Sequence, residues 1–168
     1  MYTFFIEQHY QGDSNPGNFI LLEETNQIGL IDFGCMPKIA HPKFSENMIR
    51  LFDAFSSFDH QVIFDAITEM GWMIEGTERP LFESSVKDYC KVFNALLDPS
   101  GIDFSKNQKL YMDFRIAGGK MNKCINVSGD FPSFHRAFTT LIGVFTSLKS
   151  TVNLRASFEG VKKQFQAR

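Results

Sequence analysis

Residues 11–34, QGDSNPGNFILLEETNQIGLIDFG, carry the pattern that decides the fold expected for this 168-residue chain. The segment 13–18 contains Pro and Gly, which both oppose the continuation of a helix, so it is expected to form a turn. Two short apolar runs follow at 19–22 and 28–31, and polar residues separate them. This spacing predicts a small β-hairpin that leads into Asp32-Phe33-Gly34.

Beyond the hairpin, apolar residues recur at helical spacing. They predict one helix around 48–55 and a second around 62–70, capped by Asp59. Pro80 is expected to open a third helix, which the turn at 98–101 ends.

Further along the chain, Gly118-Gly119 is expected to form a bend, and an apolar pattern predicts another helix from Pro132 to about Leu154. The expected fold class is mainly α with a small β-hairpin, in a single domain over residues 1–168.

Composition excludes several classes of protein. Seventeen basic and nineteen acidic residues leave a net charge of -2, which gives no strong field to attract nucleic acid. The three cysteines form no C-x-x-C pair, so neither a disulfide framework nor a zinc site is expected, and a reducing, cytoplasmic location fits. No apolar run approaches the roughly 20 residues of a transmembrane helix. The 19 phenylalanines predict a core of bulky aromatic side chains.

The order of polar residues in 11–34 is the order that kinase-type phosphotransferases use. Such enzymes hold a divalent metal on oxygen ligands, and Asn18 and Asp32 supply an amide carbonyl and a carboxylate. Asp13 stands where a group would orient the acceptor hydroxyl and take its proton. In this scheme Phe33 packs beneath the metal site. The alternative is that Asp13, Asn18 and Asp32 are turn and cap residues of a surface loop.

The segments 13–18 and 29–35 resemble the catalytic loop and the metal-binding loop of the UbiB/AarF family of atypical kinases, which is associated with coenzyme Q biosynthesis. Members show H-x-D-P-x-P-G-N and then I-D-F-G. Here Gln11 stands in place of the His, and Ser14 in place of the first Pro, a change expected to loosen the turn slightly.

The resemblance implies a protein-kinase-like C-lobe, with the catalytic loop at 11–18, the metal-binding loop at 32–34 and a helical remainder at 44–168. It implies that Asp13 is the catalytic residue and that Asn18 and Asp32 bind both the metal, Mg²⁺ or Mn²⁺, and the ATP cofactor. The implied activity is that of an ATP- and Mg²⁺-dependent kinase or ATPase linked to coenzyme Q or lipid metabolism. Its acceptor is unidentified, a lipophilic molecule being one option, and peripheral membrane attachment is an option for its location.

In the family, the nucleotide-covering lobe and its lysine lie upstream of the catalytic loop, and ten residues precede Gln11 here. We therefore expect a C-terminal lobe alone, with weak or no catalysis by itself. Apolar surface near Phe19 and Phe33 is expected to be exposed, where the missing lobe or a self-association partner would sit.

Two other functions stay open from the sequence. One is a small-molecule phosphotransferase of the aminoglycoside or choline type, whose G-D-x-x-x-x-N motif Gly12-Asp13 fits. The other is a non-catalytic helical scaffold that retains the loop.

Overall fold

The computed structural model describes residues 7–39, 43–125 and 130–167, with side chains described from residue 135 in the last range. Most of these residues are helical, with two small antiparallel sheets, so the predicted fold class is confirmed. In chain order the elements are η1 (Pro16–Asn18), β1 (Phe19–Leu22), β2 (Gln27–Leu30), α2 (Phe44–Ser57), α3 (His60–Glu69), α4 (Arg79–Leu96), β3 (Ile102–Asp103), α5 (Lys109–Met121), α6 (Asp130–Ser147), β4 (Thr151–Val152) and α7 (Leu154–Gln166).

The helix boundaries between 44 and 101 follow the predicted signals. The Asp59 carboxylate accepts a hydrogen bond from the Val62 amide at 3.0 Å and caps α3. Pro80 lies in the first turn of α4, where its missing N–H costs nothing. After α4 the chain turns at Gly101, whose φ of 84° is a conformation that glycine adopts without strain.

The predicted bend at Gly118-Gly119 is wrong, because both glycines lie inside α5. The reason is a tertiary contact. A Cβ atom at Gly118 would lie 2.8 Å from Nε2 of His135 on α6, so glycine at this position lets the two helices approach closely. Gly119 has open space around its Cα.

The predicted helix from Pro132 to about Leu154 is also corrected. α6 ends at Ser147, and the backbone of Lys149 is left-handed, with φ of 50°. The chain then forms β4, in which Val152 pairs with Ile102 of β3, before α7 begins behind an Asn153 cap. Two-residue strands have too little pattern to be recognised in a sequence, so this second sheet was not predicted.

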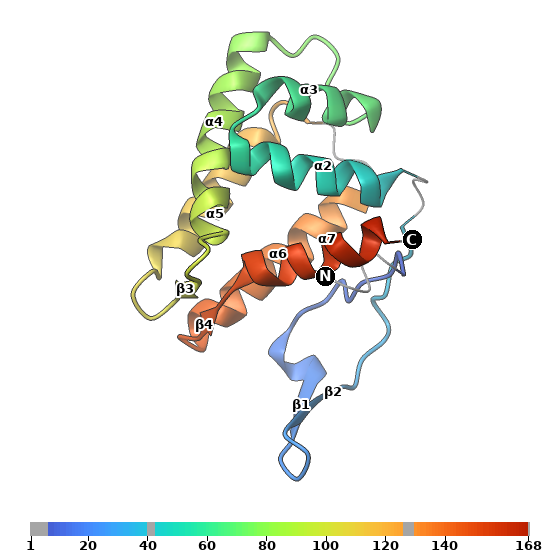
Figure 1. Cartoon of the computed structure of the whole chain (residues 1–168), viewed down its shortest axis with the longest axis vertical. Helices are drawn as coiled ribbons and strands as arrows, with labels where there is room; N and C mark the ends of the chain where they lie inside the picture. The colour runs from blue at the N-terminus through green and yellow to red at the C-terminus, as the bar shows by residue number, and fades with distance from the viewer. Residues whose placement is uncertain (1–6, 40–42, 126–129, 168) are drawn as a thin grey trace.

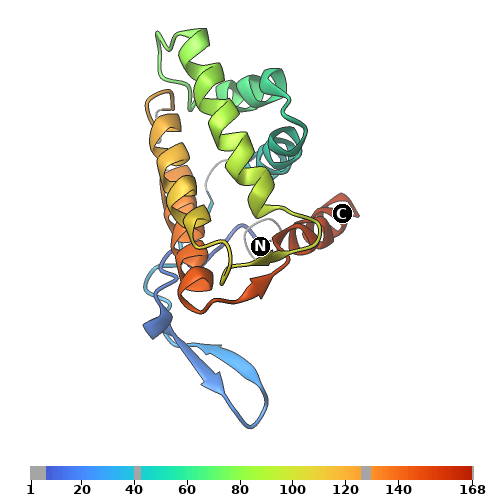
Figure 2. The same cartoon turned by 90° about the vertical axis from the view of Figure 1, so that its left-hand side faces the viewer.

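The core is aromatic, as predicted. Phe44, Phe82, Phe93, Phe104 and Phe114 are among its fully buried side chains. α2 packs against α3 and α4, and α5 packs against α4 and α6 (Figures 1 and 2).

The last helix closes over this core from one side. Phe158 of α7 stacks on Phe52 of α2, with ring centroids 4.7 Å apart. Lys162 and Asp53 join the same two helices by an ion pair of 2.6 Å. Within the described part of the chain, no helix has the length and apolar character needed to cross a membrane.

The hairpin β1–β2 projects from one end of the helical body (Figures 1 and 2). Its register pairs Phe19 with Leu30 and Leu22 with Gln27, and the turn 23–26 joins the strands. Phe19 is 38% exposed and Phe33 is 64% exposed. The predicted exposure of apolar surface in this region is therefore confirmed.

Candidate functional site

The loop before the hairpin is built by side chains that bond to their own backbone. The Asp13 carboxylate accepts from the Asn15 amide at 3.2 Å, and the Asn15 side chain accepts from the Gly17 amide at 3.0 Å. Asn and Asp favour such turns because their short side chains reach the backbone two residues on. The Asn18 side-chain NH₂ then donates to the Asp13 carbonyl at 3.1 Å, so these two predicted residues are in direct contact.

Gln11 joins this loop to the segment around Asp32. Its Nε2 donates to the Asp32 carbonyl at 2.7 Å, and its Oε1 accepts from the Asp13 amide at 3.2 Å. One side-chain amide thus contacts both predicted loops, with a donor on one and an acceptor on the other. Imidazole also offers one donor and one acceptor, which explains how Gln can stand where the related pattern has His.

Two backbone hydrogen bonds reinforce the bridge that Gln11 makes. The Gly12 amide donates to the Cys35 carbonyl at 2.7 Å, and the Ile31 amide donates to the Asn18 carbonyl at 3.0 Å. The segments 11–18 and 31–35 therefore lie side by side. Residues that are separated by the whole hairpin in the sequence meet at its base.

The structure explains why residue 12 is glycine, which was not predicted from the sequence. A Cβ at this position would lie 2.7 Å from Sγ of Cys35, so any larger residue would push the two segments apart. The Gly12-Asp13 pair was the feature that fitted a small-molecule phosphotransferase. Because the contact with Cys35 already requires glycine, the pair does not distinguish between kinase types.

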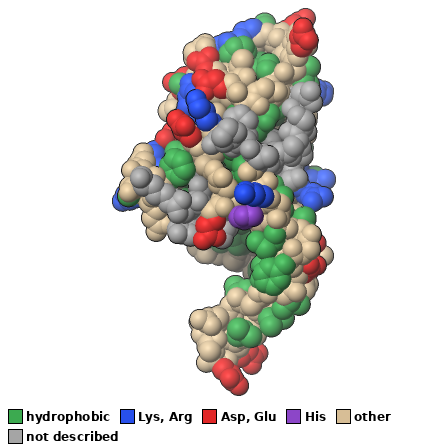
Figure 3. Space-filling view, turned by 90° about the vertical axis from the view of Figure 1, so that its right-hand side faces the viewer, with side chains coloured by type: hydrophobic (Ala, Val, Ile, Leu, Met, Phe, Trp, Pro, Cys, Tyr) green, Lys and Arg blue, Asp and Glu red, His purple; other side chains and the backbone are tan. Residues whose placement is uncertain are grey.

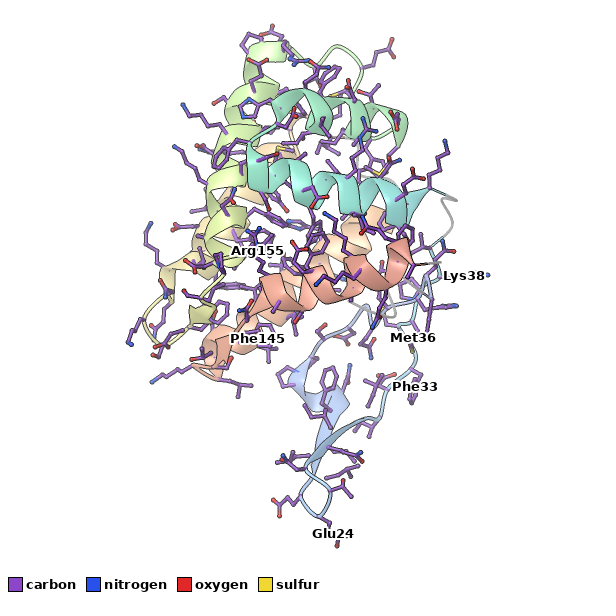
Figure 4. The ribbon with its side chains drawn as sticks, viewed as in Figure 1. Glu24, Phe33, Met36, Lys38, Phe145 and Arg155 are labelled. Atoms are coloured by element: carbon purple, nitrogen blue, oxygen red, sulfur yellow. The ribbon has the colours of Figure 1, made fainter. Side chains whose placement is uncertain are left out.

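The segment at Asp32 is held by its own turn. The Asp32 carboxylate accepts from the Gly34 amide at 2.7 Å through Oδ1. The predicted packing of Phe33 beneath the site is wrong, because its ring is 64% exposed and lies on the outer side of the segment that leads from the hairpin to Lys38 (Figure 4).

α6 contacts both segments of the site. No local pattern in the sequence predicts this contact. The Ser14 hydroxyl donates to the carbonyl of Ala137 at 3.5 Å, and the guanidinium of Arg136 lies 3.9 Å from Sγ of Cys35. Ser14 is buried, and its hydroxyl forms this hydrogen bond between the loop and α6. This long-range contact at Ser14 was not predicted from the sequence.

The oxygen atoms of Asp13, Asn18 and Asp32 that these hydrogen bonds do not use determine which ligands the site could bind. Asn18 uses its NH₂ on Asp13, which leaves its carbonyl oxygen available, and the hydrogen bonds described above for Asp13 and Asp32 each use one carboxylate oxygen. Hard oxygen donors of this kind suit Mg²⁺ or Mn²⁺. Asp13 and Asp32 are exposed, and Asn18 is half-buried. Among the residues with described positions, no group of three or more His, Cys, Asp or Glu is placed to hold a metal, so a cation here would need the Asn18 amide.

Comparison with known proteins supports the kinase-like character of the N-terminal part. Residues 1–67 match the family model of the ABC1 atypical kinase-like domain, a range that includes both loops, the hairpin and α2. The chain is also similar to a histidine–tRNA ligase of Mesoplasma florum, at 32% identity over 95 residues. That match covers 56% of this chain and 20% of the ligase, so the chain spans about a fifth of the length of this curated relative.

Proposed function

We propose that residues 11–34 form the phosphotransfer site of an ATP- and Mg²⁺-dependent atypical kinase or ATPase of the UbiB-like type. The observation that carries the proposal is the bridge made by Gln11, because it brings the loop of Asp13 and Asn18 against the segment of Asp32. The match of residues 1–67 to the ABC1 atypical kinase-like domain supports the same proposal independently.

In the proposal, the Asn18 carbonyl oxygen and the Asp32 carboxylate hold the metal. Both belong to backbone segments fixed by hydrogen bonds, the Asn18 side chain through Asp13 and the Asp32 carboxylate through the Gly34 amide. When bound, Mg²⁺ neutralises the charge of the triphosphate and orients it. Mn²⁺ has similar ligand preferences and would be held by the same atoms.

Asp13 serves as the group that faces the acceptor. Its carboxylate orients an acceptor hydroxyl or a water molecule and accepts the proton as the new bond to the γ-phosphorus forms. The bond from that phosphorus to the bridging oxygen breaks, and ADP leaves with the bonding electrons. One Asp13 oxygen is fixed by the Asn15 amide, which holds the carboxylate in place for this role.

We propose a lipophilic acceptor, in keeping with a link to coenzyme Q or lipid metabolism and with peripheral contact with a membrane from the cytoplasm. Ile31 and Phe33 flank Asp32 and expose 55% and 64% of their surfaces, so an apolar molecule would find contacts beside the carboxylate. Full activity in this proposal also needs a nucleotide-covering lobe that carries a lysine.

The test is calorimetric titration of the chain with ATP, with and without Mg²⁺. We expect Mg²⁺-dependent binding that Asp32→Asn weakens at least about tenfold, because the amide keeps the bond to Gly34 but loses the charge that the metal needs. Asp98→Asn is the matched control: Asp98 is an exposed carboxylate that accepts from the amide two residues on, as Asp32 does. Equal affinities of the wild type and Asp32→Asn for MgATP would refute the proposal.

The exposure of the hairpin favours a second candidate, a non-catalytic module that uses this region to bind a partner. The same titration separates the two functions. An absence of binding at millimolar MgATP would favour the non-catalytic module over the kinase.

A further inference from the structure

The two faces of the hairpin differ in composition. Side chains alternate between the faces of a strand, and directly paired residues share a face. The register therefore places Phe19, Leu21, Ile28 and Leu30 on one face, where every side chain is apolar. In Figure 3, hydrophobic side chains follow the projecting arm and acidic ones mark its tip.

The backbone of Leu21 faces the outer edge of β1. Hydrogen-bonded and non-hydrogen-bonded pairs alternate in an antiparallel ladder. Since the Ile31 amide donates to the Asn18 carbonyl, the Ile20–Gly29 pair is bonded and the Leu21–Ile28 pair is not. The N–H and C=O of Leu21 thus point away from β2, and those of Ile28 point away from β1.

The apolar face of the hairpin is open to solvent. On it, Leu21 is 63% exposed, Ile28 is 73% exposed and Phe19 is 38% exposed. Exposed apolar side chains gathered on one face mark a surface that can take part in an interaction.

We propose that the outer edge of β1 pairs with the same edge of a second copy of this chain, in antiparallel orientation, with the two Leu21 residues opposite each other. In this arrangement the N–H and C=O of each Leu21 bond to those of its counterpart. The result is a four-stranded sheet in which the apolar faces of both hairpins are continuous. An edge strand without Lys or Pro, such as β1, is the kind that pairs readily with another chain.

Charge disfavours the parallel orientation. Residues 11–37 contain four acidic residues and no Lys or Arg, and Glu23 and Glu24 lie in the turn at the tip of the hairpin. Parallel pairing would bring the carboxylates of both tips together, which is unfavourable. Antiparallel pairing places the tips at opposite ends of the sheet.

The β1 edge is chosen over the β2 edge for two reasons. β1 consists of four large apolar residues, whereas β2 contains Gly29, which weakens a strand. The chain after β2 also runs directly into Asp32, so pairing along β1 leaves that carboxylate accessible. Apart from this second reason, the inference uses only the edges, the exposure and the charge of the hairpin, so it does not depend on the proposed function.

The test measures the mass of the purified chain by light scattering after size exclusion, over a range of concentrations. We expect the wild type to reach twice the chain mass of 19.2 kDa. Leu21→Pro removes the outward N–H of β1 and leaves the ladder with β2 intact, so it should weaken dimerisation at least about tenfold. Ile28→Pro is the matched control on the opposite edge and should remain dimeric.

A second control addresses general hydrophobic association. Leu148 lies outside the hairpin and is 71% exposed, so Leu148→Glu should not change the mass. Circular dichroism verifies that each variant keeps its helices. A monomeric wild type at all concentrations would overturn the proposal, as would equal effects of the two proline variants or loss of the dimer in Leu148→Glu.

Discussion

Gln11 shows how much one side chain contributes to the candidate site. Its amide contacts the backbone on both sides of the base of the hairpin, at the Asp32 carbonyl and the Asp13 amide. The geometry of Asp13 and Asp32 relative to each other therefore depends on a residue that need not touch any ligand. Loss of this amide leaves two backbone hydrogen bonds to hold the segments together.

We predict that Gln11→Leu loosens the junction and that Gln11→His preserves it. Leucine has a similar size but no polar atom, whereas imidazole supplies a donor and an acceptor. Hydrogen exchange at the Gly12 amide, which donates to Cys35, should become about tenfold faster in Gln11→Leu, as expected for the loss of roughly one net hydrogen bond.

Gln61→Leu is the control, since Gln61 bonds to Asp65 and Arg79 away from the hairpin. Unchanged exchange at Gly12 in Gln11→Leu would mean that the backbone bonds alone hold the two segments together.

At the scale of elements, α5 contains two adjacent glycines with opposite roles. Glycine inside a helix normally costs stability relative to alanine, because it loses more backbone entropy on folding. At Gly119 nothing offsets this cost. At Gly118 the missing side chain makes room for His135 of α6.

We predict that Gly119→Ala raises the free energy of unfolding by about 0.5–1 kcal/mol. Gly118→Ala should lower it by about 1–3 kcal/mol, because the new methyl group would overlap the imidazole. Urea unfolding of both variants measures the difference. A stabilising effect of Gly118→Ala would show that α5 and α6 can separate slightly without cost.

The same pair of glycines shows which features of the fold could not be predicted from the sequence. The hairpin, the Asp59 cap and the start of α4 at Pro80 were predicted, because each depends on residues close together in the chain. The helical state of Gly118 depends on His135, and no pattern near the glycine reveals that contact.

The same limit applied within the candidate site. The Asp13 and Asp32 loops were predicted as motifs from residues close in sequence. The support that α6 gives to Ser14, from 123 residues away, was not.

At the scale of the whole molecule, His135 links stability to pH. Its ring stacks on Phe114, with centroids 5.4 Å apart, and lines a small apolar cavity with Trp72 and Tyr89. Burial lowers the pKa of His135 below its ordinary value, because the charged form loses hydration. The neutral imidazole is therefore the form that the folded protein accommodates.

We predict that the free energy of unfolding falls as the pH drops below about 6.5, the ordinary pKa of histidine. In that range the unfolded chain binds a proton that the folded chain resists, so acid favours unfolding; above about pH 7 the contribution is fully present. His135→Asn should be less stable at neutral pH, from the loss of the ring stack, but should show a weaker dependence on pH.

Urea unfolding of both proteins at about pH 7.5 and about pH 5.5 compares the two slopes on either side of that pKa. Identical slopes in the wild type and His135→Asn would exclude His135 as the source of the dependence.

The contact between Gly12 and Cys35 also provides a chemical probe of the site. Cys90 and Cys124 are fully buried, and burial raises the pKa of the Cys90 thiol to about 12, which keeps it protonated and unreactive. Cys35 is half-buried, with Gly12 directly over its sulfur. An alkylating reagent would therefore modify Cys35 first, and only as fast as the base of the hairpin opens. The rate of that labelling would therefore measure how often the segments 11–18 and 31–35 separate.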